Sequence, residues 1–185
     1  MTNVTFHTVR RAAILVCCIA AGMLLANPAY SQSATSGNSN VVQVSSLNCS
    51  TAAGTNMFAV VSWSVGSQSV SNPRLTAGAA YGAANLAPLQ VVKAFDSCSP
   101  ALFGGSVAGT HLSTLTLTVS NSNKIRLLTI VLSEVTVSSY QLADAGPASE
   151  AAETVAFTYG RISITNYGPG GGSFCWDVPA RRTCQ

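Results

Sequence analysis

Charged residues are scarce in this chain of 185 residues, which has nine Lys or Arg, six Asp or Glu and two His. After residue 31, seven basic side chains face six acidic ones, which leaves a net charge of +1. There is no basic cluster of the kind that binds nucleic acid. So few acids and bases leave little for acid–base catalysis, so we predict a protein that is not an enzyme and uses no cofactor. A surface this poor in charge is typical of an extracytoplasmic β protein or of an assembly subunit.

Apolar runs long enough to cross a membrane are also lacking. The uncharged run Ala12–Ala26 has 15 residues, fewer than the roughly 20 that a transmembrane helix needs. It follows Arg10-Arg11 and precedes small residues at Ala29 and Ser31, the pattern of a secretory signal peptide. We therefore predict a signal peptide over residues 1–31, cleaved after Ser31. The mature protein is then periplasmic or secreted, with no membrane contact.

Four of the six cysteines remain after this cleavage, and they are our candidates for disulfides: Cys49, Cys98, Cys175 and Cys184. An even number of cysteines in an exported chain predicts two disulfides, although four cysteines allow three connectivities. A local Cys175–Cys184 bridge is favoured, because it would close a short loop and stabilise the fold by about 2–3 kcal/mol. The spacing does not fit a zinc site, and His111 is the one histidine after residue 31, so we predict no metal.

Alternating apolar and polar side chains predict six strands. These are Val41–Leu47, Met57–Ser69, Leu89–Phe95, His111–Val119, Arg126–Ser139 and Glu153–Tyr167. The long connection 70–86 is rich in Ser, Asn, Pro, Gly and Ala and is a candidate functional loop.

One helix is predicted between the third and fourth strands. Ser99 can cap it, Pro100 fits its first turn, and Gly109 stands where a helix would stop. Sequential antiparallel strands with a single helix predict a mainly β fold. The expected architecture is a small antiparallel β-barrel of two sheets with one flanking α-helix.

The chain after residue 167 has a different composition. Gly168–Ser173 predicts a flexible spacer, and Phe174–Cys184 a separate appendix bounded by two cysteines. The glycine run lacks the Lys-Ser/Thr pair of a phosphate-binding loop, so no nucleotide site is predicted. The expected organisation is a signal peptide, a disordered leader over 32–40, a barrel domain over 41–167 and a tail over 168–185.

Several short motifs in the predicted domain resemble the Hcp family, the tube proteins of bacterial type VI secretion. The matching segments, in order, are Val61–Ser64, Val91–Asp96, Ser99–Leu102, Gly109–His111, Leu115–Thr118, Val137–Tyr140 and Glu153–Ile162. Together they extend over about residues 41–167. This chain departs from the family in its signal peptide, its four cysteines, its tail, and Thr110 in place of the family's lysine.

The resemblance implies the same barrel, assembled into six-membered rings (hexamers) that stack into tubes. It also implies effector carriage without enzymatic activity, self-association, contacts with secretion-apparatus or effector proteins, and a role for the 70–86 loop against a neighbouring ring. The alternative is a periplasmic or extracellular binding module that keeps the barrel without tube assembly.

Catalytic or binding roles can be suggested for some individual side chains, but a structural role is favoured for each. His111 is expected to begin a strand rather than to act in catalysis, because no relay partner lies near it in sequence. Trp63 is expected in the core, and Trp176 is expected to pack on a disulfide. Glu150 and Glu153 are expected to be solvated rather than paired for acid–base chemistry.

Overall fold

The structure, a computed structural model, describes residues 38–69, 84–144 and 151–184. The predicted signal peptide, most of the leader, Glu150 and most of the 70–86 loop lie outside these residues. The strands are β1 (Ser39–Val44), β2 (Ser50–Thr51), β3 (Gly54–Thr55), β4 (Met57–Val60), β5 (Ser62–Ser64), β6 (Ser67–Ser69), β7 (Ala84–Leu86), β8 (Leu89–Ala94), β9 (His111–Ser120), β10 (Arg126–Ala143), β11 (Ala152–Asn166), β12 (Ser173–Asp177) and β13 (Arg182–Thr183). One helix, α1 (Ser99–Ala108), lies between β8 and β9.

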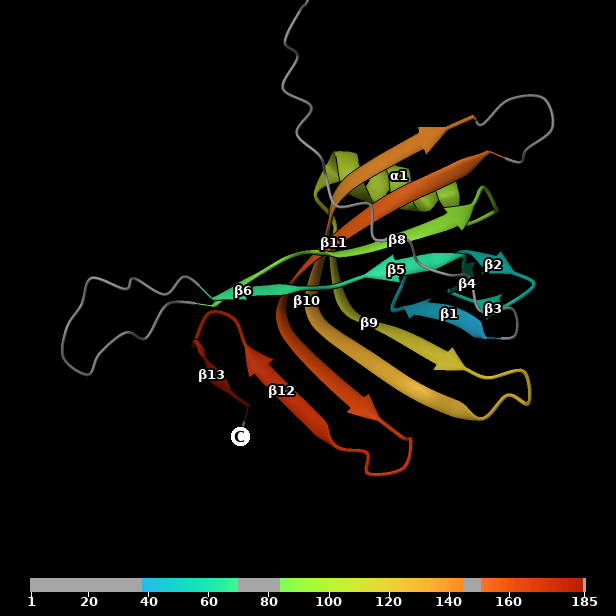
Figure 1. The fold of residues 1–185 in the computed structure, drawn as a ribbon. Helices are drawn as coiled ribbons and strands as arrows, with labels where there is room; N and C mark the ends of the chain where they lie inside the picture. Colours follow the sequence, from blue (N-terminus) through green and yellow to red (C-terminus); the bar gives the residue numbers. More distant parts are fainter. Residues whose placement is uncertain (1–37, 70–83, 145–150, 185) are drawn as a thin grey trace, which may run out of the picture. The chain divides into compact units, whose positions relative to one another are not determined.

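All strand pairings between the described residues are antiparallel, and the main sheet has the order β13-β12-β11-β10-β9-β1-β4. β8 pairs with the other part of β11, and β5 pairs with β8. β4 and β5 are separated by the single residue Val61. The pairing from β4 to β1 and on through β9, β10, β11 and β8 therefore leads to β5, which follows β4 in the chain (Figure 1).

The three long strands, β9, β10 and β11, bend sharply near their middles, so that one sheet forms two layers (Figure 1). Leu112 and Leu115 of β9 are both buried although they are three residues apart, and so are Leu132 and Val135 of β10. Side chains alternate across a strand, so an odd spacing means that the buried face changes sides. Leu112 pairs with Val135 and Leu115 with Leu132, so both strands change face at the same level.

Glu134 and Gly160 mark this change of face. Glu134 has φ of 55°, in the left-handed region that residues with a Cβ rarely adopt. Gly160 lies between the paired positions that flank Glu134, and a Cβ there would come within 3.1 Å of the Glu134 Cβ. A side chain at position 160 would therefore require Glu134 to shift where β10 and β11 approach each other at the bend.

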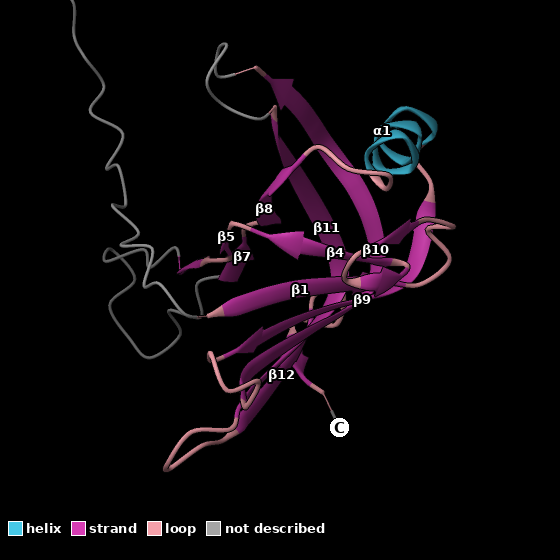
Figure 2. Ribbon diagram, turned by 90° about the vertical axis from the view of Figure 1, so that its right-hand side faces the viewer, coloured by secondary structure: helices cyan, strands magenta, loops and turns pink. Residues whose placement is uncertain are grey.

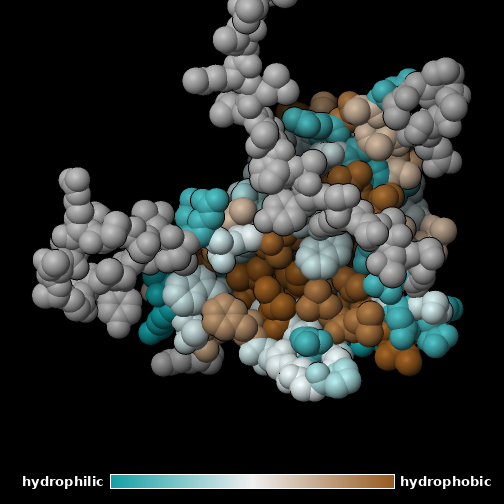
Figure 3. Space-filling view, viewed as in Figure 1, coloured by the Kyte–Doolittle hydropathy of each residue, from teal (hydrophilic) through white to brown (hydrophobic). Residues whose placement is uncertain are grey.

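Apolar side chains from both layers form one core. Its fully buried aromatic members are Phe58 and Phe157, surrounded by Leu and Val side chains of β1, β8, β9 and β10. Figure 3 shows apolar side chains gathered at the centre of one face, where the strands curve around them. The predicted fold class is confirmed as mainly β and antiparallel with one flanking helix, and its two layers belong to one continuous sheet.

Several local predictions were wrong. The predicted second strand is divided into β4, β5 and β6. At Val61 the chain leaves its pairing with β1, and the Val61 N–H donates to the Val92 carbonyl of β8 at 2.8 Å. Ser39 and Asn40, expected in the leader, belong to β1. The residues after 167 form no separate appendix, since β12 pairs with Arg161–Thr165 of β11 and extends the main sheet.

The predicted spacer is a hydrogen-bonded turn. The Asn166 N–H donates to the Gly172 carbonyl, and the Gly171 N–H donates to the Gly168 carbonyl, both at 2.9 Å. Residues 84–86, expected in the long loop, form β7, which pairs with β6. No helix among the described residues is long and apolar enough to cross a membrane.

Candidate functional site: a clamped helix with an apolar outer face

Helix α1 begins and ends close to the predicted positions. Pro100 lies in its first turn, and Gly109 ends it in the left-handed conformation with φ of 63°. The prediction that Ser99 caps the helix was wrong, because Cys98 is the N-cap residue and makes no side-chain capping bond. The Ser99 hydroxyl instead accepts a hydrogen bond from the Asp96 N–H at 2.9 Å, which fixes the turn before the helix.

A fully buried ion pair lies beneath the start of this helix. Lys93 of β8 and Glu153 of β11 both have zero exposure, and they are direct partners in the pairing of these strands. The Lys93 Nζ also lies 2.9 Å from the Asp96 Oδ1, donates to the Ser99 hydroxyl at 3.2 Å, and stands 5.3 Å from the Phe58 ring centroid. These contacts compensate a charge that would be very costly to bury alone.

Tyr140 of β10 completes this polar cluster. Its hydroxyl donates to the second carboxylate oxygen of Glu153. Burial raises the pKa of Tyr140, and the hydrogen bond to Glu153 raises it further, so the phenol stays protonated and keeps donating. Because Lys93 and Glu153 are sealed from solvent, the cluster has the geometry of a structural support rather than of a catalytic site.

A disulfide ties the start of the helix to the segment just before β2. Cys98 is bonded to Cys49, with a Cα–Cα distance of 5.0 Å and a sequence separation of 49. The neighbouring Ser97 hydroxyl donates to the Ser50 carbonyl. The buried cluster and this disulfide together clamp α1 against β10, on which the helix packs (Figure 2).

The outward side of the clamped helix is apolar. We call this surface the helix patch; it consists of the exposed residues Pro100, Phe103, Gly104, Val107 and Ala108. Phe103 is 54% exposed and Val107 is 73% exposed, and α1 contains no charged residue. An exposed helix face normally carries polar or charged side chains. The helix patch therefore has the composition of a surface that is covered in an assembly.

Two further side chains connect the helix patch with β10. Phe103 meets Tyr140 edge-on, with 5.5 Å between the ring centroids. Leu142 follows Tyr140 by two residues, so it points to the same face of β10, and it is 54% exposed. The apolar surface thus continues from the helix onto the strand beside it.

Four side chains that the sequence singled out have defined places in the structure: His111, Trp63, Trp176 and Glu153. His111 begins β9 opposite Thr136 and is exposed. Trp63 and Trp176 are partly buried and pack against the core. The expectation that Glu153 is solvated was wrong, because the strand pairing sets it opposite Lys93 in the interior.

Sequence reasoning missed Lys93 and Tyr140. A signal for Lys93 was present: it follows Leu89 and Val91 at a spacing of two, on the buried face of β8. A charged residue at an interior strand position predicts a buried partner, and Glu153 stands at the same kind of position before Val155 and Phe157. The role of Tyr140 depends on a contact with α1 that no local pattern shows.

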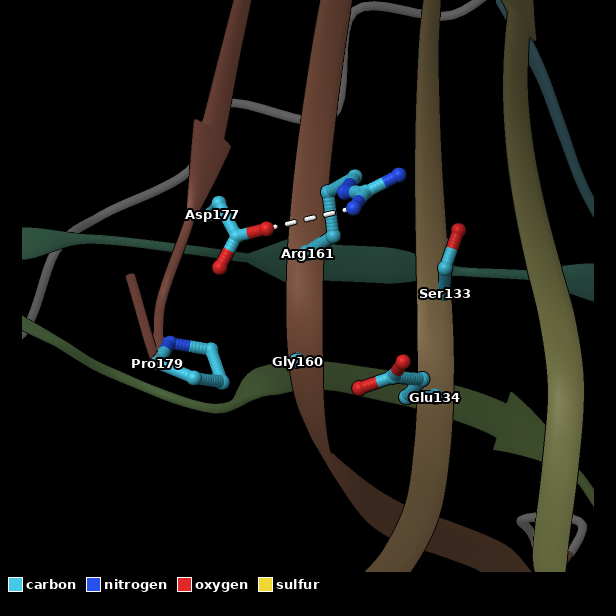
Figure 4. A pocket seen from close by; sticks show the side chains of 6 residues that line it. All are labelled: Ser133, Glu134, Gly160, Arg161, Asp177 and Pro179. Atoms are coloured by element: carbon cyan, nitrogen blue, oxygen red, sulfur yellow. Dashed lines mark hydrogen bonds and ion pairs between the residues drawn. The ribbon is translucent and has the colours of Figure 1, made fainter. Parts of the chain in front are cut away.

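A shallow pocket lies elsewhere, beside the bend of the long strands. It is lined by Ser133, Glu134, Gly160, Arg161, Asp177 and Pro179 (Figure 4). The Arg161 Nη2 lies 3.1 Å from the Asp177 Oδ2 across the β11–β12 pair. The Ala180 N–H and this guanidinium lower the pKa of Asp177. The described residues contain no group of three side chains able to hold a metal ion.

The class that these features define is a small antiparallel β protein with a clamped flanking helix and an apolar outer face. A family model described as "Type VI secretion system effector, Hcp" matches residues 48–166, and the chain therefore belongs to the Hcp family of type VI secretion proteins. This confirms the resemblance found in the sequence. No curated protein sequence matches the chain.

Solved structures share this fold at low sequence identity. A structure titled as that of a type six secretion system protein is 19% identical, with a TM-score of 0.70 over 79% of this chain and 99% of the other. Hcp1 from Salmonella typhimurium is 16% identical, with a TM-score of 0.66 over 80% of this chain and 99% of the other. The secreted protein Hcp3 from Pseudomonas aeruginosa is also 16% identical, with a TM-score of 0.54 over 76% and 97%.

Proposed function

We propose that this Hcp-family protein is a non-enzymatic subunit that self-associates into rings, with the helix patch as part of the interface between copies. The observation that carries this proposal is an uncharged, exposed apolar helix face held rigidly on the barrel. Burial of apolar surface is the main favourable term in protein association, at about 25 cal/mol per Å² removed from water. A rigid surface also loses little conformational entropy when it binds.

The absence of enzymatic activity is part of this proposal. The charged groups that lie closest together, Lys93 and Glu153, have zero exposure and cannot meet a substrate in the folded protein. In the shallow pocket, Arg161 and Asp177 form an ion pair with each other at the surface. Effector or secretion-apparatus proteins would then be bound by the assembled ring rather than acted on.

Export through a signal peptide over residues 1–31 is the second part of the proposal. The four cysteines after this segment are bonded in two pairs, Cys49–Cys98 and Cys175–Cys184. Disulfides persist in oxidising compartments such as the periplasm and the extracellular space. We therefore expect the mature chain, beginning at Gln32, to fold and assemble there.

The test compares two charge substitutions at exposed apolar positions. The full chain is expressed with its own N-terminus, and the exported protein is examined by light scattering and electron microscopy, with its N-terminus determined by mass spectrometry. Val107→Glu lies in the helix patch, whereas the control Ile125→Glu lies in the β9–β10 turn and is similarly accessible, at 60% exposure.

We expect rings for the wild type and for Ile125→Glu. Val107→Glu should weaken assembly at least tenfold, because a carboxylate would be buried without a partner in the interface. A wild-type protein that stays monomeric at all concentrations would contradict ring formation. Rings that survive Val107→Glu unchanged would contradict the assignment of the interface.

A further inference from the structure

The buried cluster beneath α1 holds two full charges away from water. The Lys93 Nζ contacts the carboxylates of both Glu153 and Asp96. The side chains of Lys93 and Glu153 have zero exposure, whereas that of Asp96 is 25% exposed. A buried ion pair carries a desolvation cost that the attraction between its charges often does not offset. A reaction that turns this pair into a neutral group is therefore favoured by its surroundings.

Lys93 and Glu153 are placed to react with each other. They are direct partners in the β8–β11 pairing, and the Lys93 Nζ contacts the Glu153 Oε1. Residues directly opposite in an antiparallel pair point to the same face, with their Cβ atoms about 4.5–5.5 Å apart. The fold thus holds a primary amine against a carboxyl group. Well-oriented groups within one molecule react as if at an effective concentration of about 10⁵–10⁸ M.

The Glu153 carboxyl group is held by a hydrogen-bond donor on its other oxygen. The Tyr140 hydroxyl donates to the Oε2, while the lysine contacts the Oε1. Burial and this hydrogen bond raise the pKa of Tyr140, so its hydroxyl keeps its proton. When a nucleophile adds to a carboxyl carbon, negative charge develops on the oxygen, and a fixed donor there lowers the barrier. Tyr140 has the position of such a donor.

Asp96 is placed to move a proton from the amine. Its Oδ1 lies 2.9 Å from the Lys93 Nζ, within the reach that general acid–base transfer requires. The same oxygen accepts the Cys98 N–H at 2.8 Å. Solvent and this N–H both stabilise the Asp96 carboxylate, so Asp96 suits the role of proton acceptor and Glu153 that of the reacting acid. The fully buried Phe58 ring, 5.3 Å from the Nζ, adds an apolar wall to the site.

We propose that the Lys93 amine and the Glu153 carboxyl group condense within the folded chain to an amide bond, which joins β8 covalently to β11. The new bond links the Lys93 Nζ to the Glu153 Cδ, and the Cδ–Oε1 bond breaks with release of one water. The reaction needs no oxidant, cofactor or second protein. It involves the interior of one chain and does not depend on ring formation.

The protons and charges balance within the cluster. The Lys93 ammonium gives one proton to the Oε1, which leaves a neutral amine beside a neutral acid, the forms that burial favours. The Nζ adds to the Cδ, and the negative charge that appears on the Oε2 is held by the Tyr140 hydroxyl. Asp96 takes a proton from the nitrogen and passes it to the Oε1 hydroxyl, which leaves as water. The product is a neutral amide, and Asp96 is again a carboxylate.

This amide would be a second covalent support beneath the helix. The Cys49–Cys98 disulfide holds the start of α1, and the Lys93–Glu153 bond would join two strands through residues 60 apart in sequence. A reductant opens a disulfide but leaves an amide intact. The strands under the helix would therefore stay joined after reduction.

The test is the mass of the exported full-length protein, measured after reduction and denaturation and compared with the sequence from its determined N-terminus. We expect the wild type to be one water lighter than its sequence. Trypsin should cleave after the exposed Lys124 but not after Lys93. The digest should contain a branched peptide in which residues 75–124 are joined to residues 127–161 through Lys93 and Glu153. The control variants Lys93→Met and Glu153→Met should each have the full mass of their sequence.

Two further variants keep both reacting groups and test the assigned roles. Asp96→Asn removes the proton acceptor, and Tyr140→Phe removes the donor to the Oε2. Each full-length chain is collected unfolded in urea, before reaction, and is refolded with oxidised glutathione while its mass is followed. We expect both variants to lose water at least tenfold more slowly than the wild type.

The decisive measurement is made on the wild type and does not depend on the folding of any variant. A wild-type chain of full mass that trypsin cleaves after Lys93 would overturn the proposal. A loss of water that maps to other residues would overturn it as well. Equal rates in the wild type, Asp96→Asn and Tyr140→Phe would overturn the roles given to Asp96 and Tyr140.

Discussion

The two disulfides hold their regions in opposite ways. Cys49–Cys98 connects residues 49 positions apart and is almost completely buried, beside the Lys93–Glu153 pair and under the start of α1. Cys175–Cys184 spans nine positions and closes a hairpin at the edge of the sheet. The first fixes one segment of the fold relative to another, whereas the second fixes only the internal shape of one hairpin.

This difference distinguishes a bridge that joins two distant segments of the fold from one that lies within a single hairpin. The clamped helix presents an apolar outer face, and such a face can serve as an interface only if its position is constant. The hairpin fills a sheet edge through strand pairing, two apolar pairs and one exposed ion pair. Local stability varies within a fold in this way, and elements with few buried contacts open first.

The largest expected effect comes from the cluster under the helix. Lys93→Met leaves Glu153 buried without its cation, and we expect a loss of about 3–5 kcal/mol in the free energy of unfolding. Urea denaturation of the purified variant measures this loss. The double variant Lys93→Met/Glu153→Met should lose less than the single variant, because it buries no unpaired charge. A single variant within about 1 kcal/mol of the wild type would show that the buried ion pair contributes little to stability.

The second prediction compares the disulfides directly. By the chain-entropy relation, removing Cys49–Cys98 costs about 4 kcal/mol and removing Cys175–Cys184 costs about 3 kcal/mol. The difference should be larger in practice, because the Cys175–Cys184 bridge holds only a hairpin at the edge of the sheet. The two double alanine variants are compared by urea denaturation, after mass mapping shows that the remaining bridge is intact. An equal loss for the two variants, or the reverse order, is the outcome against this comparison.

The smallest effect is expected at the ion pair of the hairpin. The folded-state pKa of Asp177 lies below its ordinary value of 3.8, because the Ala180 N–H and then Arg161 stabilise the carboxylate. A depressed pKa stabilises the fold above the ordinary pKa, and this contribution is lost as the pH falls through the folded-state value. Asp177→Asn should therefore melt slightly below the wild type at pH 6, and the difference should shrink as the pH falls below 3.8. A difference that does not change with pH would assign the effect to packing instead of charge.

Sequence patterns predicted the parts of this fold that depend on local chemistry. The alternation in His111–Val119 and Glu153–Tyr167 predicted β9 and β11 to within one residue at each end. Pro100 and Gly109 predicted both ends of α1, because each acts through its own backbone geometry. The family resemblance of Val91–Val119 also came from adjacent residues and was confirmed by the family match over 48–166.

The errors fall where distant segments meet. Glu153 lies next to a loop but on the buried face of β11, and its partner Lys93 is 60 residues away in sequence. The residues after 167 have the composition of a spacer and an appendix, but β11 offered an open edge that strand pairing fills. The helix patch was also missed, because the exposure of Phe103 and Val107 depends on which side of α1 packs on β10.

The sequence by itself determined the succession of strands, the single helix, the family and the number of disulfide-forming cysteines in the described domain. These follow from side-chain periodicity, from the backbone preferences of Pro and Gly, and from short motifs, all of which act over a few residues. Only the tertiary structure decided that Cys49 pairs with Cys98, where the charges are buried and which apolar face stays outside. Each of these depends on contacts between segments far apart in the chain, which only the folded structure brings together.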